Sequence, residues 1–442
     1  MRILQVIHGY PTRYNAGSEI YTQTISRELI RRGHEVEVFT REEAQFRSDY
    51  SVRQDMDPVE PSIRLHLVNM PRSREGYRHD EVDQVFEQVA SSFRPDVIHI
   101  GHLNHLSTSL VQRAKDRDFP VVFTLHDFWL MCPRGQFMQY NVGGPVPWAS
   151  CDGQDDRKCA TQCYSRNFGG AQSDLPGDIQ YWTDWVHRRM AHVREVAGCV
   201  DLFVAPSRTV RDKILNDFGI SPERVVYLDY GFDTGRLAGR TRAPEHGFVF
   251  GYIGTHRPAK GIQTLLEAFP KVKGDVTLRI WGRSVADTTP SLKEQSQRLP
   301  EQAAGRVEWM GEYGTPTIVS DVFNRVDALV VPSIWLENSP LVIHEAQQAR
   351  VPIITADLGG MAEYVHHGEN GLLFKPRDPD ALAAEMQRLA DNPTLARRLG
   401  DRGYLYSADR NIPSVEEHVR ELVLHYETAI RNRGYRAGVD RR

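Results

Sequence analysis

The chain has 442 residues, of which 25% are charged, and its formal net charge at pH 7 is −4. This length is too great for a single hydrophobic core and predicts two domains. The near-neutral charge gives no whole-chain argument for a nucleic-acid partner. No apolar run approaches the roughly 20 residues of a membrane-spanning helix. The N-terminal MRILQVIHGYP is too short in its apolar part for a secretory signal, so we expect a cytoplasmic protein.

Short apolar runs alternate with helical patterns along the first half of the chain. These runs predict buried parallel strands at residues 2–10, 35–40, 96–100, 120–127 and 201–207. Between the first two, residues 18–34 carry apolar side chains at helical spacing, and Gly33 provides the stop signal. The repeated β-α-β order predicts a doubly wound parallel sheet.

A second series of the same kind predicts strands at residues 248–254, 276–282, 307–311, 328–333 and 351–356. We therefore expect two Rossmann-like α/β domains with a ligand-binding cleft between them. The predicted domains are residues 1–230 and 231–411, with a C-terminal helix over about 412–442 packing back on the first. Residues 234–247, rich in Gly, Pro and Arg, predict a linker, and the basic end over 431–442 is expected to fray.

An insertion at about residues 132–179 interrupts the first series, and its acidic, Gly- and Pro-rich part from 141 onward predicts a surface loop. It holds four of the five cysteines: Cys132, Cys151, Cys159 and Cys163. Their spacing is not a standard zinc pattern, yet four thiols this close can bind a structural Zn²⁺. Ordinary reduced cysteines explain the pattern equally well.

Two β-α loops carry anion-binding features. The loop over residues 8–19 has Gly17 before the first helix, but it lacks both G-x-G-x-x-G and a Walker pattern. The loop after the 248–254 strand carries Arg257 and Lys260 at a helix start, which suits a diphosphate. A plain β-α connection and solvated cations are the alternatives.

The stretch WLENSPLVIHEA, residues 335–346, places Glu337 and Glu345 eight residues apart. Ser339 is expected to be the N-cap and Pro340 the first helical residue. The free N–H groups of that helix start form an anion site between the two carboxylates. A nucleotide sugar has the matching order of sugar hydroxyls, diphosphate and ribose hydroxyls. Without further context, two glutamates in salt bridges explain the pattern better.

Further motifs supply that context. They are AGSE (16–19), RRGHEVEVFT (31–40), TLHD (124–127), APS (205–207), DYGFD (229–233), GYIGTHRPAKG (251–261), ADLGGMAEYV (356–365) and HHGENGLLF (366–374). In this order, and with the E-x7-E pattern of Glu337 and Glu345, the chain resembles the GT-B nucleotide-sugar glycosyltransferases of the retaining family 4. The resemblance covers nearly the whole chain.

This resemblance implies roles for individual residues. Glu337 would hold donor-sugar hydroxyls and Glu345 the ribose, and the Gly359–Gly360 pair would form a structural turn near the donor. His126 would lie beside the donor sugar and the reacting centre. Asp127 would orient the acceptor or His126, and a strand-end cap is its equal alternative. The diphosphate would be held by a larger set: Gly17, Arg257, Lys260, Ser339, Pro340, Leu341 and Val342.

One departure concerns the phosphate clamp. Such enzymes usually carry Arg directly after the first glycine of the G-x6-G loop, where this chain has Thr255. Arg257 or Arg283 are the candidates to replace that charge.

The resemblance implies retaining transfer of a hexose-type sugar, from a UDP-sugar by preference, in polysaccharide or glycoconjugate biosynthesis. We expect a front-face substitution in which the leaving phosphate takes the acceptor proton. We expect no catalytic cofactor or metal, because the helix N-terminus, Lys260 and Arg257 supply positive charge and the sequence lacks a paired-Asp metal motif.

The acceptor is predicted to be a glycan, a lipid-linked sugar or a small molecule, bound by the aromatic residues Phe137, Tyr140 and Trp148 of the insertion. Peripheral membrane binding through Arg27, Arg31 and Arg32 is one interpretation, and a solvated helix face is the favoured one. A sugar-nucleotide epimerase, a phosphorylase-like enzyme and a silent sugar-nucleotide-binding protein are the rival functions.

Overall fold

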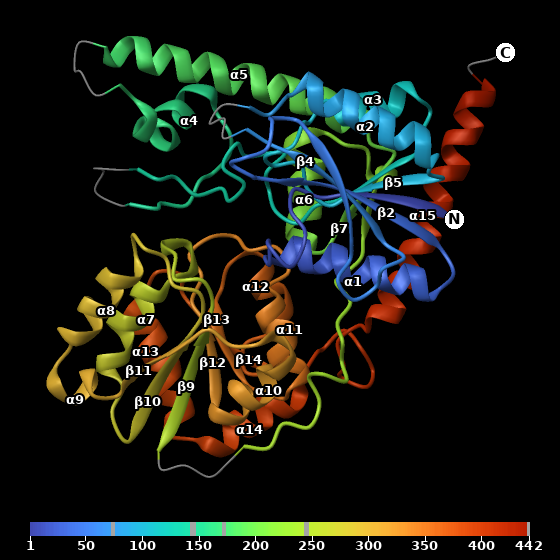
Figure 1. The fold of residues 1–442 in the computed structure, drawn as a ribbon. Coiled ribbons are helices and arrows are strands. Elements are labelled where there is room, and N and C mark those ends of the chain that lie inside the picture. The colour runs from blue at the N-terminus through green and yellow to red at the C-terminus, as the bar shows by residue number, and fades with distance from the viewer. Residues whose placement is uncertain (72–75, 142–146, 170–173, 243–246, 440–442) are drawn as a thin grey trace. The chain divides into compact units, whose positions relative to one another are not determined.

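The computed structural model describes residues 1–71, 76–141, 147–169, 174–242 and 247–439, which form two compact units (Figure 1). The first unit comprises Met1–Pro147, Cys151–Gly231 and Val415–Arg442, and the second comprises Trp148–Ser150 and Phe232–Ser414. Apart from the short segment Trp148–Ser150, the chain changes unit after Gly231 and Ser414, next to the predicted limits at 230 and 411. None of the helices in the described ranges is long and apolar enough to cross a membrane.

The described part of the first unit contains an eight-stranded sheet in the order β3-β4-β2-β1-β5-β6-β7-β8, parallel except for β3. Its strands are β1 (Arg2–Val6), β2 (Glu35–Glu42), β3 (Val52–Met56), β4 (Arg64–Asn69), β5 (Val97–Ile100), β6 (Val121–Thr124), β7 (Leu202–Ala205) and β8 (Val225–Tyr227). The five strands expected from sequence all form; β1, β6 and β7 end earlier than predicted, β5 ends at the predicted residue, and β2 ends later. The sequence prediction missed β3, β4 and β8.

Helices cover both faces of this sheet, with α1 and α15 on one face and α2, α3 and α5 on the other (Figure 1). Their bounds are α1 (Gly17–Arg31), α2 (Asp80–Phe93), α3 (Leu110–Asp116), α4 (Asp156–Cys163), α5 (Leu175–Cys199), α6 (Arg208–Phe218) and α15 (Val415–Val439), with short 3₁₀ turns η1 (Ser165–Asn167) and η2 (Pro222–Arg224). After α1, Gly33 has φ +82° and its N–H donates to the Ile30 carbonyl, while the His34 N–H donates to Leu29. This is a Schellman motif, and it confirms Gly33 as the stop.

The C-terminal helix α15 belongs to the first unit. It buries Val419, Leu422 and Tyr426, and the Tyr426 hydroxyl lies 2.6 Å from His99 Nδ1 at the end of β5. The fraying predicted from residue 431 is wrong as far as Val439, because the helix continues to that residue, and 440–442 lie outside the described residues.

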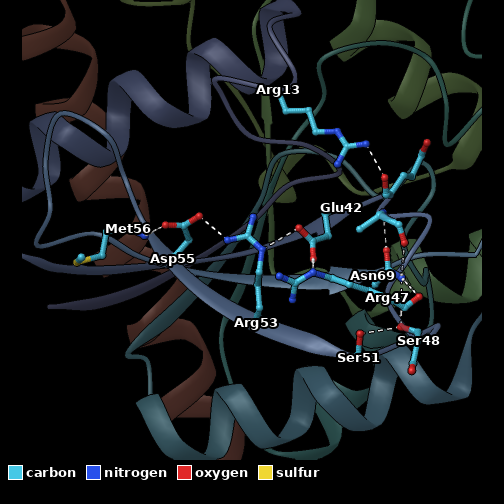
Figure 2. Close-up of polar contacts among 11 residues, drawn as sticks. Arg13, Glu42, Arg47, Ser48, Ser51, Arg53, Asp55, Met56 and Asn69 are labelled. Carbon is cyan, nitrogen blue, oxygen red and sulfur yellow. Dashed lines mark hydrogen bonds and ion pairs between the residues drawn. The ribbon is translucent and has the colours of Figure 1, made fainter.

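Polar contacts hold the edge strand β3 against the rest of the sheet (Figure 2). Arg53 of β3 donates from Nε to Glu42 Oε2 of β2 at 2.9 Å. Asn69 of β4 holds the loop that precedes β3 by donating to the carbonyls of Arg47 and Ser48. Every residue of the strand VRQDM except the half-buried Arg53 is exposed, and only Val52 and Met56 are apolar, which is why the hydrophobic pattern did not reveal it.

The insertion is more ordered than the predicted surface loop, because it contains α4, η1 and the start of α5. Asp155 caps α4 by accepting a hydrogen bond from the Lys158 N–H, and Pro176 occupies the tolerated first turn of α5. The apolar face of α4 packs on Trp182, Val186 and Met190 of α5. Residues 142–146 and 170–173 of the predicted loop lie outside the described residues.

The described part of the second unit contains a six-stranded parallel sheet in the order β11-β10-β9-β12-β13-β14. Its strands are β9 (Phe248–Ile253), β10 (Val276–Trp281), β11 (Val307–Gly311), β12 (Ala328–Val331), β13 (Ile353–Ala356) and β14 (Gly371–Phe374), of which only β14 was not predicted. The helices α7, α8 and α13 lie on one face, and α11 and α12 on the other (Figure 1).

The helices of this unit are α7 (Ile262–Ala268), α8 (Thr289–Gln297), α9 (Glu301–Ala304), α10 (Ile318–Asp321), α11 (Leu341–Gln348), α12 (Gly359–Tyr364), α13 (Pro379–Ala390) and α14 (Pro393–Arg402), with 3₁₀ turns η3 (Pro258–Lys260), η4 (Phe269–Lys271), η5 (Thr315–Thr317) and η6 (Phe323–Arg325). The segment predicted as a linker is docked on the second unit rather than free, as far as it is described. Arg240 donates to the Phe323 and Val326 carbonyls, and Arg242 pairs with Asp327 at 2.8 Å. Residues 243–246 of this segment lie outside the described residues.

Candidate active site

Each sheet has a topological switch point, where successive connections run in opposite directions along the sheet. In the first sheet β1 and β5 are neighbours there, and in the second β9 and β12 are neighbours. Doubly wound folds bind ligands beyond the carboxyl ends of the strands at this point. The residues that follow β1, β5, β9 and β12 are therefore the first candidates for the site.

Beyond β9 and β12, a lysine and a glutamate form an ion pair. Lys260, in the turn after β9, donates from Nζ to Glu337 Oε1 at 2.7 Å. The Ser333 hydroxyl, just after β12, donates to the same oxygen at 2.7 Å. The Glu337 side chain is only 7% exposed, whereas that of Lys260 is 35% exposed. A buried carboxylate is thus held in one orientation by two donors, beside a cation that reaches solvent.

The backbone of Glu337 adopts φ +35°, a conformation that non-glycine residues rarely take. The glycine pair of α12 packs directly against this loop. A Cβ on Gly359 would lie 1.7 Å from the Leu336 carbonyl oxygen, and one on Gly360 would lie 1.4 Å from the Asn338 oxygen. The Gly360 N–H also donates to the Leu336 carbonyl at 2.9 Å. These contacts hold Glu337 in a strained conformation, as is typical of functional sites.

The helix that follows Glu337 begins one residue later than expected. Pro340, with extended ψ of 111°, is the N-cap of α11, and Leu341 is the first helical residue. The predicted cap at Ser339 is therefore wrong, because the Pro340 carbonyl accepts the first turn's hydrogen bond, from the Ile343 N–H at 3.0 Å. The start of α11 nevertheless lies between Glu337 and Glu345, as the sequence predicted.

Glu345 is the fifth residue of α11 and is buried. Arg236 donates from its guanidinium to Glu345 Oε1 at 3.1 Å. Burial raises the pKa of Glu345, while the Arg236 charge opposes that rise. Both glutamates of the E-x7-E pattern thus have a basic partner, but they are buried rather than placed on the surface.

The two cations proposed to replace the missing arginine at Thr255 differ from Lys260 in their exposure and in their pairing. Arg257 and Arg283 are both exposed, and the described residues offer neither of them an ion-pair partner. The two loops that carry them are joined by a hydrogen bond from the His256 N–H to the Arg283 carbonyl at 3.1 Å. Both side chains are free to meet an anionic ligand.

In the first unit, the predicted histidine and aspartate lie just past the end of β6. A small pocket there is lined by His126 and Asp127 together with His102, from the end of β5, and Trp129. His126 Nδ1 lies 2.6 Å from the Tyr230 hydroxyl. Burial lowers the pKa of His126 well below its ordinary value, and His102 lowers it further, so the imidazole is neutral. Gly17 is the first residue of α1 and follows an N-cap, Ala16, that makes no side-chain cap bond.

Family models match most of the chain. Residues 16–236, half of its length, match the family described as "Glycosyltransferase Family 4", and residues 247–392 match the family described as "Glycosyl transferases group 1". The chain belongs to glycosyltransferase family 4.

This glycosyltransferase is also similar to named relatives and to solved structures. It is 24% identical to the glycogen synthase of Mycobacterium tuberculosis over 90% of this chain and 88% of that protein. It is 24% identical to the MMP alpha-(1->4)-mannosyltransferase of Mycolicibacterium hassiacum, over 94% of this chain and 95% of that protein. The crystal structure of Anabaena HepE with UDP superimposes with a TM-score of 0.67 and 17% identity, over 97% and 100% of the two chains. The fold is GT-B, as predicted.

Several further predictions for the glycosyltransferase need correction. Phe137, expected to bind acceptor, is buried and packs edge-on against Phe128. Tyr140 already stacks with the guanidinium of Arg134, 3.9 Å from its ring centre. Phe137 is therefore part of the packing of the insertion, whereas Tyr140 and Trp148 are both half-buried and their predicted contact with an acceptor stays a prediction.

The arginines of α1 are all paired with carboxylates. Arg27 binds Asp57, and both Arg31 and Arg32 bind Glu28. These ion pairs favour the interpretation of the three arginines as a solvated helix face over their interpretation as a membrane-binding surface.

The cysteine cluster does not form a metal-ligand set. Among the described residues, no three His, Cys, Asp or Glu side chains are grouped so that they could hold a metal ion. Cys159 and Cys163 instead lie in the hydrophobic cluster of α4 and α5, where burial raises the pKa of both thiols to about 12. Cys132 and Cys151 are free cysteines as well. The structural zinc stays a prediction. The observed arrangement of the described cysteines does not support it.

The sequence reasoning missed four residues that contact the predicted site residues: Arg236 and Ser333 in the second unit, and Tyr230 and His102 in the first. Arg236 had no local signal, because its partner lies 109 residues away in the chain. Ser333 ends the predicted strand 328–333 and His102 lies two residues past the predicted strand 96–100, and these positions were a usable signal. Tyr230 follows β8, which the sequence prediction missed, so it had no such signal.

Proposed function

We propose that this glycosyltransferase moves a hexose-type sugar from a UDP-sugar to a hydroxyl group of a glycan, a lipid-linked sugar or a small molecule. Transfer proceeds with retention at the anomeric carbon and without a metal ion. The observation that carries the proposal is the buried Glu337, held by Lys260 and Ser333 at the switch point of the second sheet. The solved complexes of HepE with UDP and with UDP-glucose support UDP-glucose as the first donor to test.

The second unit supplies the donor site in this proposal. Glu337 Oε1 is occupied by its two donors, so the second oxygen of the carboxylate accepts hydrogen bonds from the sugar hydroxyls. Glu345 holds the ribose hydroxyls in the same way, because Arg236 occupies only one of its oxygens. The diphosphate binds the first-turn N–H groups of α11 and the cation of Lys260, with Arg257 or Arg283 in place of the missing arginine.

The reaction breaks the bond between the anomeric carbon and the diphosphate oxygen and forms a bond from the acceptor oxygen on the same face of the sugar. The departing phosphate oxygen takes the proton of the acceptor hydroxyl, so the two changes balance. The positive groups around the diphosphate stabilise the negative charge that develops on it. These groups belong to the protein, and the proposal therefore needs no metal ion.

The first unit binds the acceptor in this proposal, with His126 beside the transferred sugar. Tyr230 has no other hydrogen-bond acceptor for its hydroxyl proton among the described residues, so it donates to His126 Nδ1. The imidazole then carries its proton on Nε2, which is buried without a partner in the described chain. This N–H is available to donate to a hydroxyl of the acceptor. Asp127 orients the acceptor in the same site.

Two substitutions test the donor site. Glu337→Ala is expected to lower sugar transfer from UDP-glucose by at least about 10²-fold with little change in UDP affinity, because it removes contacts to the sugar. Glu345→Ala is expected to weaken UDP binding by about tenfold, the loss of roughly one good hydrogen bond. Transfer and calorimetric binding at parent values in both variants would refute the assignment. A parallel thermal-shift screen with UDP, GDP and ADP identifies the base.

Stereochemistry and metal dependence need separate tests. Proton NMR of the product formed from UDP-α-glucose should show an α-linked glucosyl group, and a β-linked product would contradict retention. Transfer should persist in EDTA, whereas activity that disappears in EDTA and returns with Mg²⁺ or Mn²⁺ would contradict metal independence.

A further inference from the structure

Two imidazoles lie together at the switch point of the first sheet, where β1 and β5 are neighbours. His8 follows β1 and His102 follows β5, and their ring centres are 4.5 Å apart. Each is paired with its own carboxylate. His8 Nε2 lies 3.3 Å from Glu19 Oε1, and His102 Nε2 lies 3.3 Å from Asp127 Oδ1. The proposed function gives no role to His8, Glu19 or His102.

The hydrogen bonds determine which nitrogen of each ring carries the proton. His102 Nδ1 accepts a hydrogen bond from the Asn104 N–H at 2.9 Å, so its proton lies on Nε2 and is donated to Asp127. Burial acts to raise the pKa of Glu19, but the His8 and Ser18 hydrogen bonds lower it to about 2. Glu19 is therefore a carboxylate, and the His8 Nε2–H donates to it.

This assignment leaves His8 Nδ1 as a bare lone pair. The atom is buried, and the described residues provide it with no hydrogen-bond partner. The imidazole stays neutral, because burial lowers the pKa of His8 and the neighbouring His102 lowers it further. A buried acceptor without a donor costs free energy unless a ligand supplies the missing hydrogen. His8 Nδ1 thus marks a position for a hydroxyl or N–H donor.

The same cluster also contains a donor that has no partner in the described chain, and a half-exposed carboxylate. His126 Nε2–H is buried without a partner in the described chain, and it lies next to the end of β5, 3.7 Å from where a Cβ on Gly101 would be. Asp127 shares a pocket with His102 and His126 and is 32% exposed. Hydroxyl groups both donate and accept, so a ligand with several hydroxyls satisfies all three groups.

The charge of the cluster excludes anionic ligands. Glu19 and Asp127 contribute negative charge, and the imidazoles of His8 and His126 are neutral. Two cations act on the cluster, and both already have partners in the chain. Arg41 donates to the His8 carbonyl and pairs with Glu43, and the buried Arg189, whose charge acts on Asp127, donates to the Trp129 carbonyl. A phosphate or carboxylate group would meet net negative charge at this point.

We infer that the cluster of His8, Glu19, His102, Asp127 and His126 is the acceptor subsite, and that it binds an uncharged polyol such as a sugar ring or a cyclitol through its hydroxyl groups. His8 Nδ1 accepts from one hydroxyl, the His126 N–H donates to another, and the Glu19 carboxylate fixes the tautomer of His8. This inference rests on the proposed function and names its acceptor class.

The test compares neutral and phosphorylated probes on the full-length protein. Glucose, maltose and myo-inositol, and in parallel glucose 6-phosphate and inositol 3-phosphate, are titrated without nucleotide by ligand-observed NMR, and then as acceptors with UDP-glucose. We expect at least one neutral probe to bind and each phosphate ester to bind more weakly than its parent. Tighter binding of the phosphate esters, or binding of none of the probes, would overturn the inference.

Variants separate this subsite from the donor site. Glu19→Gln keeps the shape but lets the amide donate to His8 Nε2, which moves the imidazole proton to Nδ1 and removes the acceptor. We expect the Kd and KM of the best neutral probe to rise about tenfold, as expected for one lost hydrogen bond, while UDP affinity and circular dichroism stay unchanged. His105→Asn, in the same loop and exposed, is the matched control and should behave as the parent chain.

The two proposals fail in different ways. An unchanged KM and Kd in Glu19→Gln, or an equal effect in His105→Asn, would overturn the acceptor subsite while transfer from UDP-glucose continues. Absence of UDP binding and transfer in the parent chain would overturn the proposed function, whereas polyol binding measured without nucleotide still reports on the subsite.

Discussion

Gly360→Ala tests whether the glycine pair of α12 holds the catalytic loop in place. The substitution adds one methyl group and removes no polar atom. Its Cβ would lie 1.4 Å from the Asn338 carbonyl oxygen and 3.1 Å from that of Glu337. Van der Waals contact requires about 3.5 Å, so the α12 start and the 336–338 loop must separate by about 2 Å. The Gly360 hydrogen bond to the Leu336 carbonyl, now 2.9 Å, is lost in that movement.

A displacement of this size moves Glu337 away from Lys260 and Ser333. Misplacement of a reacting group by about 1 Å already costs about 10²-fold in rate, so we expect transfer from UDP-glucose to fall by at least that factor. The assay is UDP release at saturating UDP-glucose, with urea unfolding to measure the loss of stability. UDP affinity is expected to fall less, because Glu345, on α11, and its partner Arg236 both lie outside the displaced loop.

Gly198→Ala is the matched control, because an added Cβ there meets no atom within 4 Å and the residue lies in the helix α5. It is expected to leave activity unchanged and to stabilise the chain by up to about 1 kcal/mol. Gly360→Ala with parent turnover and parent stability would refute the reasoning that backbone contact with α12 fixes Glu337. Equal losses of activity in both variants would point to a general effect of the methyl group.

Two further substitutions address the buried ionisable groups. Tyr230→Phe removes the hydroxyl that sets the proton position on His126, and we expect turnover to fall about tenfold with unchanged UDP affinity; a parent-like kcat would contradict this. Arg236→Met leaves Glu345 without its cation, so the pKa of Glu345, already raised by burial, rises further. The folded state then holds a proton that the unfolded state has released above pH 4.5, and stability falls as pH increases. Urea midpoints of the variant should drop more between pH 5 and pH 8 than those of the parent chain, and an equal drop in both would contradict the pairing.

The parallel sheets could be predicted because buried parallel strands are continuously apolar, and the ends of these strands could not. The predicted strands at 2–10 and 120–127 included His8, His126 and Asp127, yet β1 ends at Val6 and β6 at Thr124. The shorter strands place these polar side chains beyond the sheet edge, where doubly wound folds bind ligands. The apolar pattern identifies which segments form buried strands, but it does not show at which residue each strand ends.

Contacts between distant parts of the chain account for most of the remaining differences. The pairing of Arg236 with Glu345 depends on how a polar segment docks on the second unit, and no local pattern contains that information. Cys159 and Cys163 lie one helical turn apart and face α5, a burial that their spacing alone did not distinguish from metal binding. The E-x7-E pattern was different, because the helix start between the glutamates is a local feature.

The residues at the two switch points differ in charge, and the difference matches the ligand that each is proposed to bind. In the second unit, Lys260 and the exposed Arg257 and Arg283 provide positive charge near a buried carboxylate, which suits a ligand with a diphosphate and hydroxyls. In the first, neutral imidazoles paired with carboxylates provide hydrogen-bonding atoms without positive charge. Of the two switch points, the one in the second unit therefore has the more favourable partners for a phosphate group. This difference in charge would keep a nucleotide sugar out of the acceptor subsite without any steric barrier, because the carboxylates of that subsite would repel its diphosphate.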